Sequence, residues 1–428
     1  MESRRSFVKN LGVVGSGVAL SGLAGARRLF ASELATVPSL ASMGSDFAAL
    51  REDYMLDPDT LYFNHASIGT IPRVVHEARA SYLEVCESNP WLYMWGGVWE
   101  EPREEVRAKL AEYIGCTTDE VAIIHNSTEG FNVLAQGLPL GPGDEVLFSS
   151  LNHAGASICW EHHAEAKGYS VHQFDFPILA VPSMTADDVL NAYDRQIGAN
   201  TRVLVFPHID NIVGLRYPVR ELAALARSKG VEFVAVDGAQ SLGMIPLDMR
   251  HLGVDFYASS PHKWVQSPKG LGVLFVSEGV RDSLRPMWVT WGQQRWRGSA
   301  RMFEDYGTRN LPEVITLGDA IDFQNQLGAV EKEARYRELW ELALNVVDST
   351  PELVWHSPTD WSLAASLYSI EVRGKDSGEL FRELYSEQGA VFRSFNTQGL
   401  NSSRISPNVF STDEELERLL GLMAARAG

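Results

Sequence analysis

Residues 233–240 read FVAVDGAQ, an unbroken apolar run that ends in an aspartate and a glycine. An apolar run without polar alternation predicts a β-strand buried on both faces, as strands of parallel sheets are. Comparable runs occur at residues 145–148, 202–206 and 272–275, and residues 219–227 have the apolar spacing of a helix. We therefore expect an α/β fold, in which helices cover both faces of a mostly parallel sheet.

The C-terminal part of the chain has a different pattern. Residues 331–347 and 414–426 are typical of helices, and residues 366–372 of a strand. This order predicts a smaller α+β domain after a boundary between residues 308 and 322. The expected organisation is an N-terminal segment at residues 27–60, a large domain at 61–315 and a small domain at 316–428.

Polar side chains follow the predicted strands of the large domain. Asp237 ends one strand, His153 follows another in the segment LNHAG, and Lys263 follows apolar residues 256–259 in the segment SSPHK. Ligands of open α/β sheets bind beyond the carboxyl ends of the strands. We therefore expect these three side chains to share one site.

Residues 126–132, which read NSTEGFN, add a further feature. Ser127 and Thr128 would stand at the start of a helix, where backbone N–H groups and the helix dipole favour a phosphate. A phosphate site, an amine, a carboxylate and a flat imidazole together match what pyridoxal 5′-phosphate (PLP) requires of a protein.

In this interpretation Lys263 forms the Schiff base with the cofactor and later moves protons at the substrate Cα. Asp237 keeps the pyridine nitrogen protonated, and His153 stacks on the ring. Other side chains of the same segments are expected near the ring oxygen (Gln240) and near the phosphate (Ser127, Thr128, Ser260 and His262).

Together these segments resemble the class V aminotransferase family of fold-type I PLP enzymes, which includes cysteine desulfurases, kynureninases and isopenicillin N epimerase. The pattern Asp-x-Ala-Gln is matched at residues 237–240 and Ser-x-His-Lys at residues 260–263. Thr-Thr-Glu-Gly-x-Asn is matched, with serine first, at residues 127–132. The resemblance implies the fold-type I architecture with its seven-stranded type of sheet, PLP as cofactor, and a homodimer with shared active sites.

The resemblance also implies roles for residues outside these motifs. Asn211 would lie near the ring oxygen and the substrate carboxylate, and Arg404 would bind the substrate α-carboxylate. Thr308, in the segment GTRN, would reach the phosphate of the neighbouring subunit. Asn64 and His65 would lie on the substrate side of the site.

Departures from the family pattern bear on the reaction. A cysteine desulfurase places a nucleophilic cysteine shortly before the carboxylate-binding arginine, and residues 393–403 contain none. We therefore expect a transferase or isomerase that is not a cysteine desulfurase. The sequence most resembles isopenicillin N epimerase-like members and exported enzymes that tailor peptide siderophores.

Three functions stay open at this point. The first is epimerisation or transamination at an amino-bearing carbon of an amino-acid or peptide-like substrate. The second is a PLP-dependent lyase of the kynureninase or sulfoxide-lyase type. The third is a PLP-fold binding protein that has lost activity, although Lys263, Asp237 and Arg404 are all present.

Two tryptophan-rich stretches, at residues 91–99 and 288–296, are not part of any of these motifs. Core or dimer packing would account for about half of their aromatic residues. The others could line a wide substrate mouth, where a second carboxylate would meet basic side chains (Arg295, Arg297 and Arg301).

The charge and the cysteine spacing of the chain limit the partners that it can bind. The net charge of −18 argues against a nucleic-acid partner, and the three cysteines (Cys86, Cys116 and Cys159) have no metal-ligand spacing. We expect no bound metal.

Arg4 and Arg5 precede a short Gly- and Ala-rich apolar run, so residues 1–26 are expected to be a bacterial twin-arginine signal peptide. The predicted location is periplasmic or otherwise extracytoplasmic.

Overall fold

The computed structural model describes residue 47 and residues 49–428. The expected signal peptide at residues 1–26 and most of the N-terminal segment at 27–60 lie outside the described residues. The described part of that segment contains a short 3-10 turn, η2 (Ala49–Asp53). Among the helices that are described, none is both long enough and apolar enough to cross a membrane.

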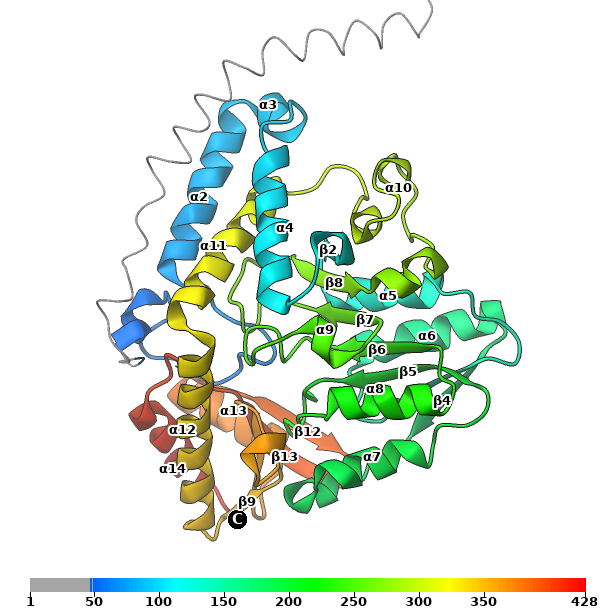
Figure 1. Cartoon of the computed structure of the whole chain (residues 1–428). Coiled ribbons are helices and arrows are strands. Elements are labelled where there is room, and N and C mark those ends of the chain that lie inside the picture. The colour runs from blue at the N-terminus through cyan, green and yellow to red at the C-terminus, as the bar shows by residue number, and fades with distance from the viewer. Residues whose placement is uncertain (1–46, 48) are drawn as a thin grey trace, which may run out of the picture.

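The large domain is built on a seven-stranded sheet with the strand order β2-β8-β7-β6-β5-β3-β4 (Figure 1). Neighbouring strands are parallel except at β8, which is antiparallel to both β2 and β7. This confirms the expected α/β fold with a mostly parallel sheet. The strands are β2 (Val121–Ile124), β3 (Glu145–Ser149), β4 (Ser170–Phe174), β5 (Thr201–Pro207), β6 (Phe233–Asp237), β7 (Phe256–Ser259) and β8 (Gly272–Val276).

Both faces of this sheet are covered, because successive side chains of a strand point to opposite faces. In β3, Val146 and Phe148 pack with the helices α5 (Ser127–Gly137) and α6 (Ala154–Lys167). Leu147 packs instead into the core that contains residues of the helices on the opposite face. Those helices are α4 (Glu100–Ile114), α7 (Ala186–Asp194), α8 (Val219–Ser228) and α11 (Leu311–Leu327).

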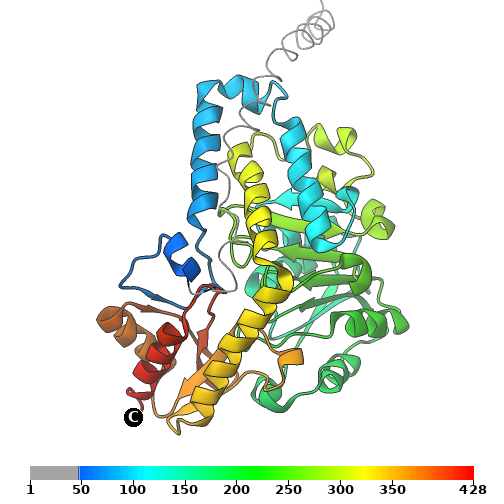
Figure 2. The same ribbon diagram turned by 60° about the vertical axis from the view of Figure 1, so that its left-hand side comes forward.

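Three long helices stand side by side at one end of the large domain, as Figures 1 and 2 both show. Helices α2 (Arg73–Ser88) and α4 both pack against α11. The short helix α3 (Pro90–Met94) joins α2 to α4. The segment between β8 and α11 carries the 3-10 turn η5 (Glu278–Ser283), the short helix α10 (Gly292–Arg295) and the 3-10 turn η6 (Ala300–Phe303).

The small domain is an antiparallel sheet with the order β12-β13-β10-β9, packed with helices. Helix α12 leads into it from Gly328, directly after α11. The elements are α12 (Ala329–Asp348), β9 (Leu353–Trp355), β10 (Tyr368–Val372), α13 (Ser377–Gln388), β12 (Arg393–Thr397), β13 (Leu400–Ile405) and α14 (Asp413–Ala424).

Two boundaries differ from the expected ones. The short strand β1 (Leu61–Tyr62) pairs in parallel with β11 (Ala390–Val391), and Leu61 and Phe63 lie in the core of the small domain. At the other boundary, α11 runs through the interval expected to contain the domain junction, and the chain turns into the small domain at Gly328. The cause in both cases is tertiary packing, which a local apolar pattern does not specify.

Candidate active site

The carboxyl ends of the parallel strands and two strands of the small domain, β12 and β13, enclose a cavity of about 610 Å³. Ligand pockets of proteins fall in this size range. The structure brings nine of the expected site residues onto its lining: Ser127, Thr128, His153, Asn211, Gln240, Ser260, His262, Lys263 and Arg404.

Lys263 lies in the turn that follows β7. Burial lowers the pKa of its amine to about 8, the Asp237 carboxylate acts to raise it, and the Arg404 guanidinium acts to lower it further. A substantial fraction of the amine is therefore unprotonated near neutral pH, as a nucleophile requires. Gly69 approaches this turn so closely that a Cβ on it would lie 2.2 Å from the Lys263 carbonyl oxygen. The chain at Gly69, whose N–H also donates to the His262 carbonyl oxygen at 3.1 Å, thus fixes the backbone that carries the lysine.

Asp237 ends β6 and is almost fully buried. Its Oδ1 accepts a hydrogen bond of 2.9 Å from the Ala239 N–H. The carboxylate lies just outside the cavity lining, yet its charge acts on the pKa values of both Lys263 and His153. It is therefore within electrostatic reach of whatever occupies the cavity.

The start of α5 forms an anion site. Asn126 caps the helix by accepting a hydrogen bond of 2.9 Å from the Glu129 N–H, and Ser127 and Thr128 occupy the first turn. The Ser260 hydroxyl bonds to the Ser127 backbone N–H at 2.9 Å and to the Ser127 hydroxyl at 3.0 Å. Hydroxyls and free N–H groups at a helix N-terminus are what a phosphate binds.

His153 caps α6 with its own side chain, because its Nδ1 accepts a hydrogen bond of 3.1 Å from the Gly155 N–H. This assigns the ring proton of the neutral imidazole to Nε2. Burial lowers its pKa, Asp237 raises it, and the cations Lys263 and Arg404 lower it. The imidazole is therefore neutral near pH 7, which suits a ring that stacks on another ring.

Arg404 reaches the cavity from β13 and is only 2 % exposed. Its guanidinium donates to the Asn211 carbonyl oxygen at 2.6 Å, to Asn64 Oδ1 at 2.9 Å and to the Ser67 hydroxyl at 2.6 Å. All three acceptors are neutral. Burial lowers the pKa of this arginine to about 9, and the nearby Arg393 lowers it further. The buried Asp210 carboxylate acts to raise that pKa, but it forms no ion pair with Arg404 within the described part of the chain. A buried guanidinium without a paired carboxylate favours an incoming one.

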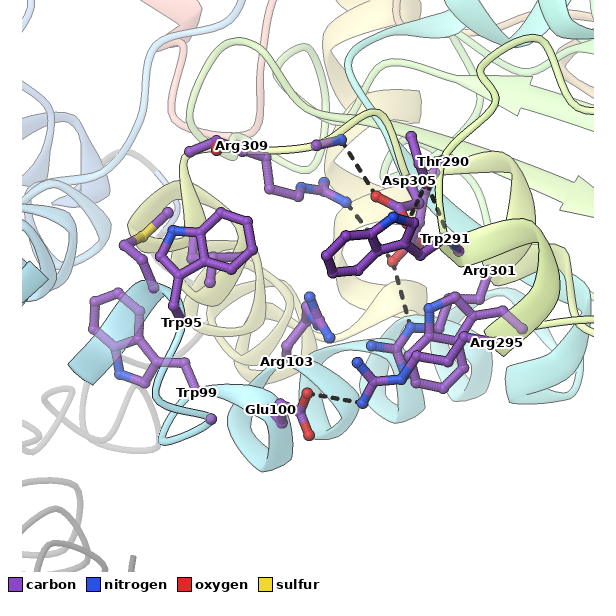
Figure 3. A pocket seen from close by; sticks show the side chains of 18 of the residues that line it. Trp95, Trp99, Glu100, Arg103, Thr290, Trp291, Arg295, Arg301, Asp305 and Arg309 are labelled. Atoms are coloured by element: carbon purple, nitrogen blue, oxygen red, sulfur yellow. Dashed lines mark hydrogen bonds and ion pairs between the residues drawn. The ribbon is translucent and has the colours of Figure 1, made fainter. Parts of the chain in front are cut away.

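Besides Asp237, three expected site residues do not line the Lys263 cavity. Asn64 lies off the lining and acts through Arg404. His65 is fully buried between Tyr62 and Phe410, and burial lowers the pKa of its imidazole to about 3. Thr308 lines a second cavity, between residues 93–103 and the segment that joins β8 to α11 (Figure 3).

The lining also includes residues that the sequence did not single out. Arg393, Phe395 and Thr397 come from β12, and Asn152 precedes His153. The stretch containing the first three drew attention only for its missing cysteine. Their alternation at every second position along the strand was the available signal. Gln240, by contrast, was expected at the ring oxygen, but its amide bonds to the Ala66 carbonyl oxygen and to the Trp264 indole.

The residues present fit PLP. The α5 N-terminus offers a phosphate site, Lys263 an amine, Asp237 a carboxylate and His153 a flat ring. Buried polar atoms on the lining lack partners within the described part of the chain, namely both side-chain polar atoms of Asn152, Nδ1 of His262 and Nε of Arg404. Among the described residues, no group of three or more His, Cys, Asp or Glu side chains is arranged to hold a metal ion.

Comparisons with known proteins identify the family of this chain. The sequence profile described as Aminotransferase class-V matches residues 61–419. Isopenicillin N epimerase of Streptomyces clavuligerus is 30 % identical over 406 residues, which cover 90 % of this chain and 99 % of that protein. A probable cysteine desulfurase of Pyrococcus abyssi is 25 % identical, over 87 % of this chain and 96 % of the relative.

A solved structure shares the fold. The protein C-DES, with glycine covalently linked to its PLP cofactor, superposes with a TM-score of 0.79 at 23 % identity, over 88 % of this chain and 99 % of C-DES. Another structure of the same protein is described as a cystine C-S lyase with its product cysteine persulfide.

These relatives correct one expectation. Cysteine desulfurases are among the proteins that this chain resembles along most of its length, so the prediction that it is not a cysteine desulfurase is wrong as an exclusion. The structure shows why the argument failed: residues 393–403 form the β12–β13 hairpin rather than a loop. A missing cysteine at those positions therefore does not decide the reaction.

The profile match over most of the chain, the epimerase relative and the nine expected side chains around one cavity lead to the same conclusion. This chain is a member of the class V aminotransferase family and uses PLP as its cofactor.

Proposed function

We propose that this protein acts at the amino-bearing carbon of an amino-acid or peptide-like substrate, by epimerisation or transamination. The observation that carries the proposal is the position of Arg404. Its guanidinium, which is in no ion pair with the residues that the structure describes, lies on the cavity that also contains the Lys263 amine. A carboxylate held there would bring its α-amino carbon toward the lysine. The relative named isopenicillin N epimerase supports a reaction at such a carbon.

Bound PLP supplies an electron sink that stabilises negative charge at the substrate Cα. The residues of this chain supply the rest. Lys263, with a pKa of about 8, can take a proton from Cα and return it near neutral pH. Arg404 orients the substrate by its carboxylate, and Asp237 preserves a positive charge on the pyridine nitrogen. Inversion at Cα would need a proton donor on the face opposite Lys263, and in a transamination PLP would supply the acceptor of the amino group.

The test is to incubate holoenzyme in D₂O with single L- and D-amino acids and with dipeptides that have a free amino terminus. Deuterium at Cα with a change of configuration indicates epimerisation, and conversion of the cofactor to its pyridoxamine form indicates transamination. Release of sulfide from cysteine, or of alanine or pyruvate from other substrates, would contradict the proposal and indicate desulfurase or lyase chemistry. Lys263→Ala is the control, because it should abolish exchange at Cα while the protein stays folded.

We further propose that the enzyme works as a homodimer. The proposal is supported by the family resemblance of the segment GTRN, in which Thr308 would serve the phosphate of the partner subunit, and by the position of Thr308 outside its own Lys263 cavity. Mixing Lys263→Ala with Thr308→Ala protein tests it. If the sites are shared, one of the two active sites of each mixed dimer keeps both residues intact, and activity recovers. An active monomer would contradict the proposed homodimer.

Export by the twin-arginine route is also a proposal, and it rests on Arg4, Arg5 and the apolar run that follows them. Replacement of both arginines by lysine should retain the protein in the cytoplasm of a bacterial host. Equal periplasmic fractions of variant and wild-type protein would contradict the proposal.

A further inference from the structure

Two arginines stand side by side on the β12–β13 hairpin. Arg393 of β12 is paired with Arg404 of β13 in the antiparallel register, and both side chains line the Lys263 cavity. Residues directly opposite each other in such a pair project from the same face of the sheet, with Cβ atoms about 5 Å apart. One wall of the active cavity therefore presents two guanidiniums.

The ring of Phe395 supports both of these side chains. Its centroid lies 5.9 Å from Cζ of Arg393 and 5.5 Å from Cζ of Arg404. Phe395 follows Arg393 by two positions along β12, so its side chain projects from the same face of the strand. An aromatic face attracts a cation, but it carries no net charge. The ring thus helps to place the two guanidiniums without neutralising them.

Neither guanidinium forms an ion pair within the described part of the chain. The Arg393 side chain also donates no hydrogen bond to a described residue, and its charge acts to lower the pKa values of Arg404 and His153. Like charges directly opposite each other destabilise a pair of β-strands. An anion bound at this wall would relieve the repulsion between the two arginines.

Acidic side chains are absent from the lining of this cavity among the residues that the structure describes. The two carboxylates whose charges reach the cavity lie off its lining. Asp210 accepts hydrogen bonds of 2.6 to 2.9 Å from three backbone N–H groups of its own loop, and Asp237 is expected at the pyridine nitrogen of PLP. The cofactor phosphate has its own site at the start of α5. No group on the lining thus competes with a substrate anion for Arg393 and Arg404.

Arg404 has the donors for one carboxylate only. A guanidinium has five N–H donors, and three of them already bind oxygens of Asn211, Asn64 and Ser67. The Nε donor is among those that remain. The two that are left match the two oxygens of one carboxylate in number. A second carboxylate on the same substrate would therefore meet Arg393.

The two arginines also differ in how firmly they are held. Arg404 is buried and fixed by its three hydrogen bonds, whereas Arg393 is exposed to solvent and contacts the ring of Phe395. A fixed arginine suits a carboxylate whose position is set by the reacting carbon. A solvent-facing arginine suits a carboxylate whose position depends on the length of the substrate side chain.

We propose that the substrate is an amino dicarboxylate, in which Arg404 binds the α-carboxylate and Arg393 binds a carboxylate at the end of the side chain. The inference rests on the function proposed above, because it takes Arg404 as the α-carboxylate site, and it adds the substrate class. Arg393 is then the residue that determines specificity, since an uncharged substrate side chain would leave its guanidinium unpaired.

Isothermal titration calorimetry of holoenzyme tests for the second carboxylate without requiring a reaction. The ligands are succinate, glutarate and adipate, each compared with its monoamide, in which an uncharged amide replaces one carboxylate. None of them has an amino group that could react with the cofactor. We expect the dicarboxylate of best-fitting length to bind at least tenfold more tightly than its monoamide. Arg404→Lys should weaken the binding of both, which places the ligands in the Lys263 cavity.

Variants of Arg393 then identify the residue that binds the second carboxylate. Arg393→Met should reduce the preference for the dicarboxylate over its monoamide at least tenfold, and Arg393→Lys, which keeps the charge, should retain part of that preference. Arg382→Met is the matched control, because Arg382 is likewise exposed and unpaired within the described residues but does not line the cavity. The cofactor absorbance of each variant verifies that it is folded.

Two outcomes would overturn the inference. Equal affinity of the wild-type protein for every dicarboxylate and its monoamide would mean that the wall binds one carboxylate only. An unchanged preference in Arg393→Met would mean that the second carboxylate binds elsewhere.

Failure of the proposed function would be recognised separately, because amino acids would then show neither exchange at Cα nor transamination, whatever the dicarboxylates do. When both proposals hold, an amino dicarboxylate such as glutamate should react with at least tenfold higher kcat/KM than its uncharged counterpart glutamine.

Discussion

The lowered pKa of Lys263 makes a quantitative prediction about how the apoenzyme captures its cofactor. A lysine in water has a pKa of about 10.5, and burial lowers that of Lys263 to about 8. The difference corresponds to about 3.4 kcal/mol in favour of the neutral amine. At pH 7 the reactive neutral fraction rises by a factor of about 300 relative to an ordinary lysine. Asp237 opposes the shift, so Asp237→Asn should lower the pKa further, and Arg404→Met should raise it.

The assay is stopped-flow capture of PLP by apoenzyme between pH 6 and 10, followed by the change in cofactor absorbance. Dividing each rate by that of N-acetyl-lysine amide removes the titrations of the cofactor itself. Both amines gain reactivity in parallel below pH 8, so the ratio should be constant there. Above pH 8 the enzyme amine is already neutral, and the ratio should fall. A ratio that stays constant to pH 10 would refute the lowered pKa.

Three further predictions concern binding and stability. Arg404→Lys keeps the charge but loses the guanidinium fork, and should weaken amino-acid binding about 10- to 100-fold in spectral titrations of holoenzyme; equal affinity would mean that the carboxylate binds elsewhere. Gly69→Ala places a Cβ 2.2 Å from the Lys263 carbonyl oxygen and should destabilise that turn by about 1–3 kcal/mol, measured as lower PLP content and a lower Tm. Gly141→Ala, whose Cβ would have no atom within 4 Å, is its control. Lys332 is buried, and its pKa is lowered to about 7. Because the unfolded chain holds this proton up to about pH 10.5, stability should rise with pH between 7 and 10.5, by at most about 5 kcal/mol. Lys332→Met should lose this rise in urea unfolding at pH 7 and 9, and an unchanged slope would contradict the lowered pKa.

The sequence predicted the strands of the large domain well, because burial on both faces leaves a continuous apolar run. Residues 233–236 form most of β6, and residues 202–206 fall within β5. The reversed direction of β8 could not be predicted from residues 272–275, since an antiparallel strand inside a covered sheet is equally apolar. The meeting of Lys263 with His153 followed from their positions at strand ends.

Side chains that reach the site from the small domain were harder to predict. Arg404 was assigned through a family motif, whereas Arg393 and Phe395 on the neighbouring strand carried no motif and were missed. The pairing of β1 with β11 joins positions more than 300 residues apart, and nothing local to Leu61 specifies its partner. Tertiary contacts of this kind override local pattern.

The role of an arginine in this molecule depends on its hydrogen-bond and ion-pair partners more than on its burial. Arg107 has its own carboxylate, Glu304, in a bidentate pair, and its function is structural. Arg404 donates its hydrogen bonds to neutral oxygens, and Arg103 has only a long contact of 3.6 Å with Glu104 within the described part of the chain.

Placing a cation out of water costs several kcal/mol when no carboxylate pairs with it. Arg404 carries this cost at the Lys263 cavity, and a substrate carboxylate bound there would offset it. The contrast with Arg107 can be tested by charge removal. Glu304→Gln should destabilise the fold by about 3–5 kcal/mol, whereas Arg103→Met should leave the Tm unchanged or raise it, because Arg103 is 18 % exposed and its contact with Glu104 is long, at 3.6 Å. If Arg103→Met instead destabilised the protein as much as Glu304→Gln, Arg103 would be a structural residue like Arg107, and the quality of its ion pair would not decide its role.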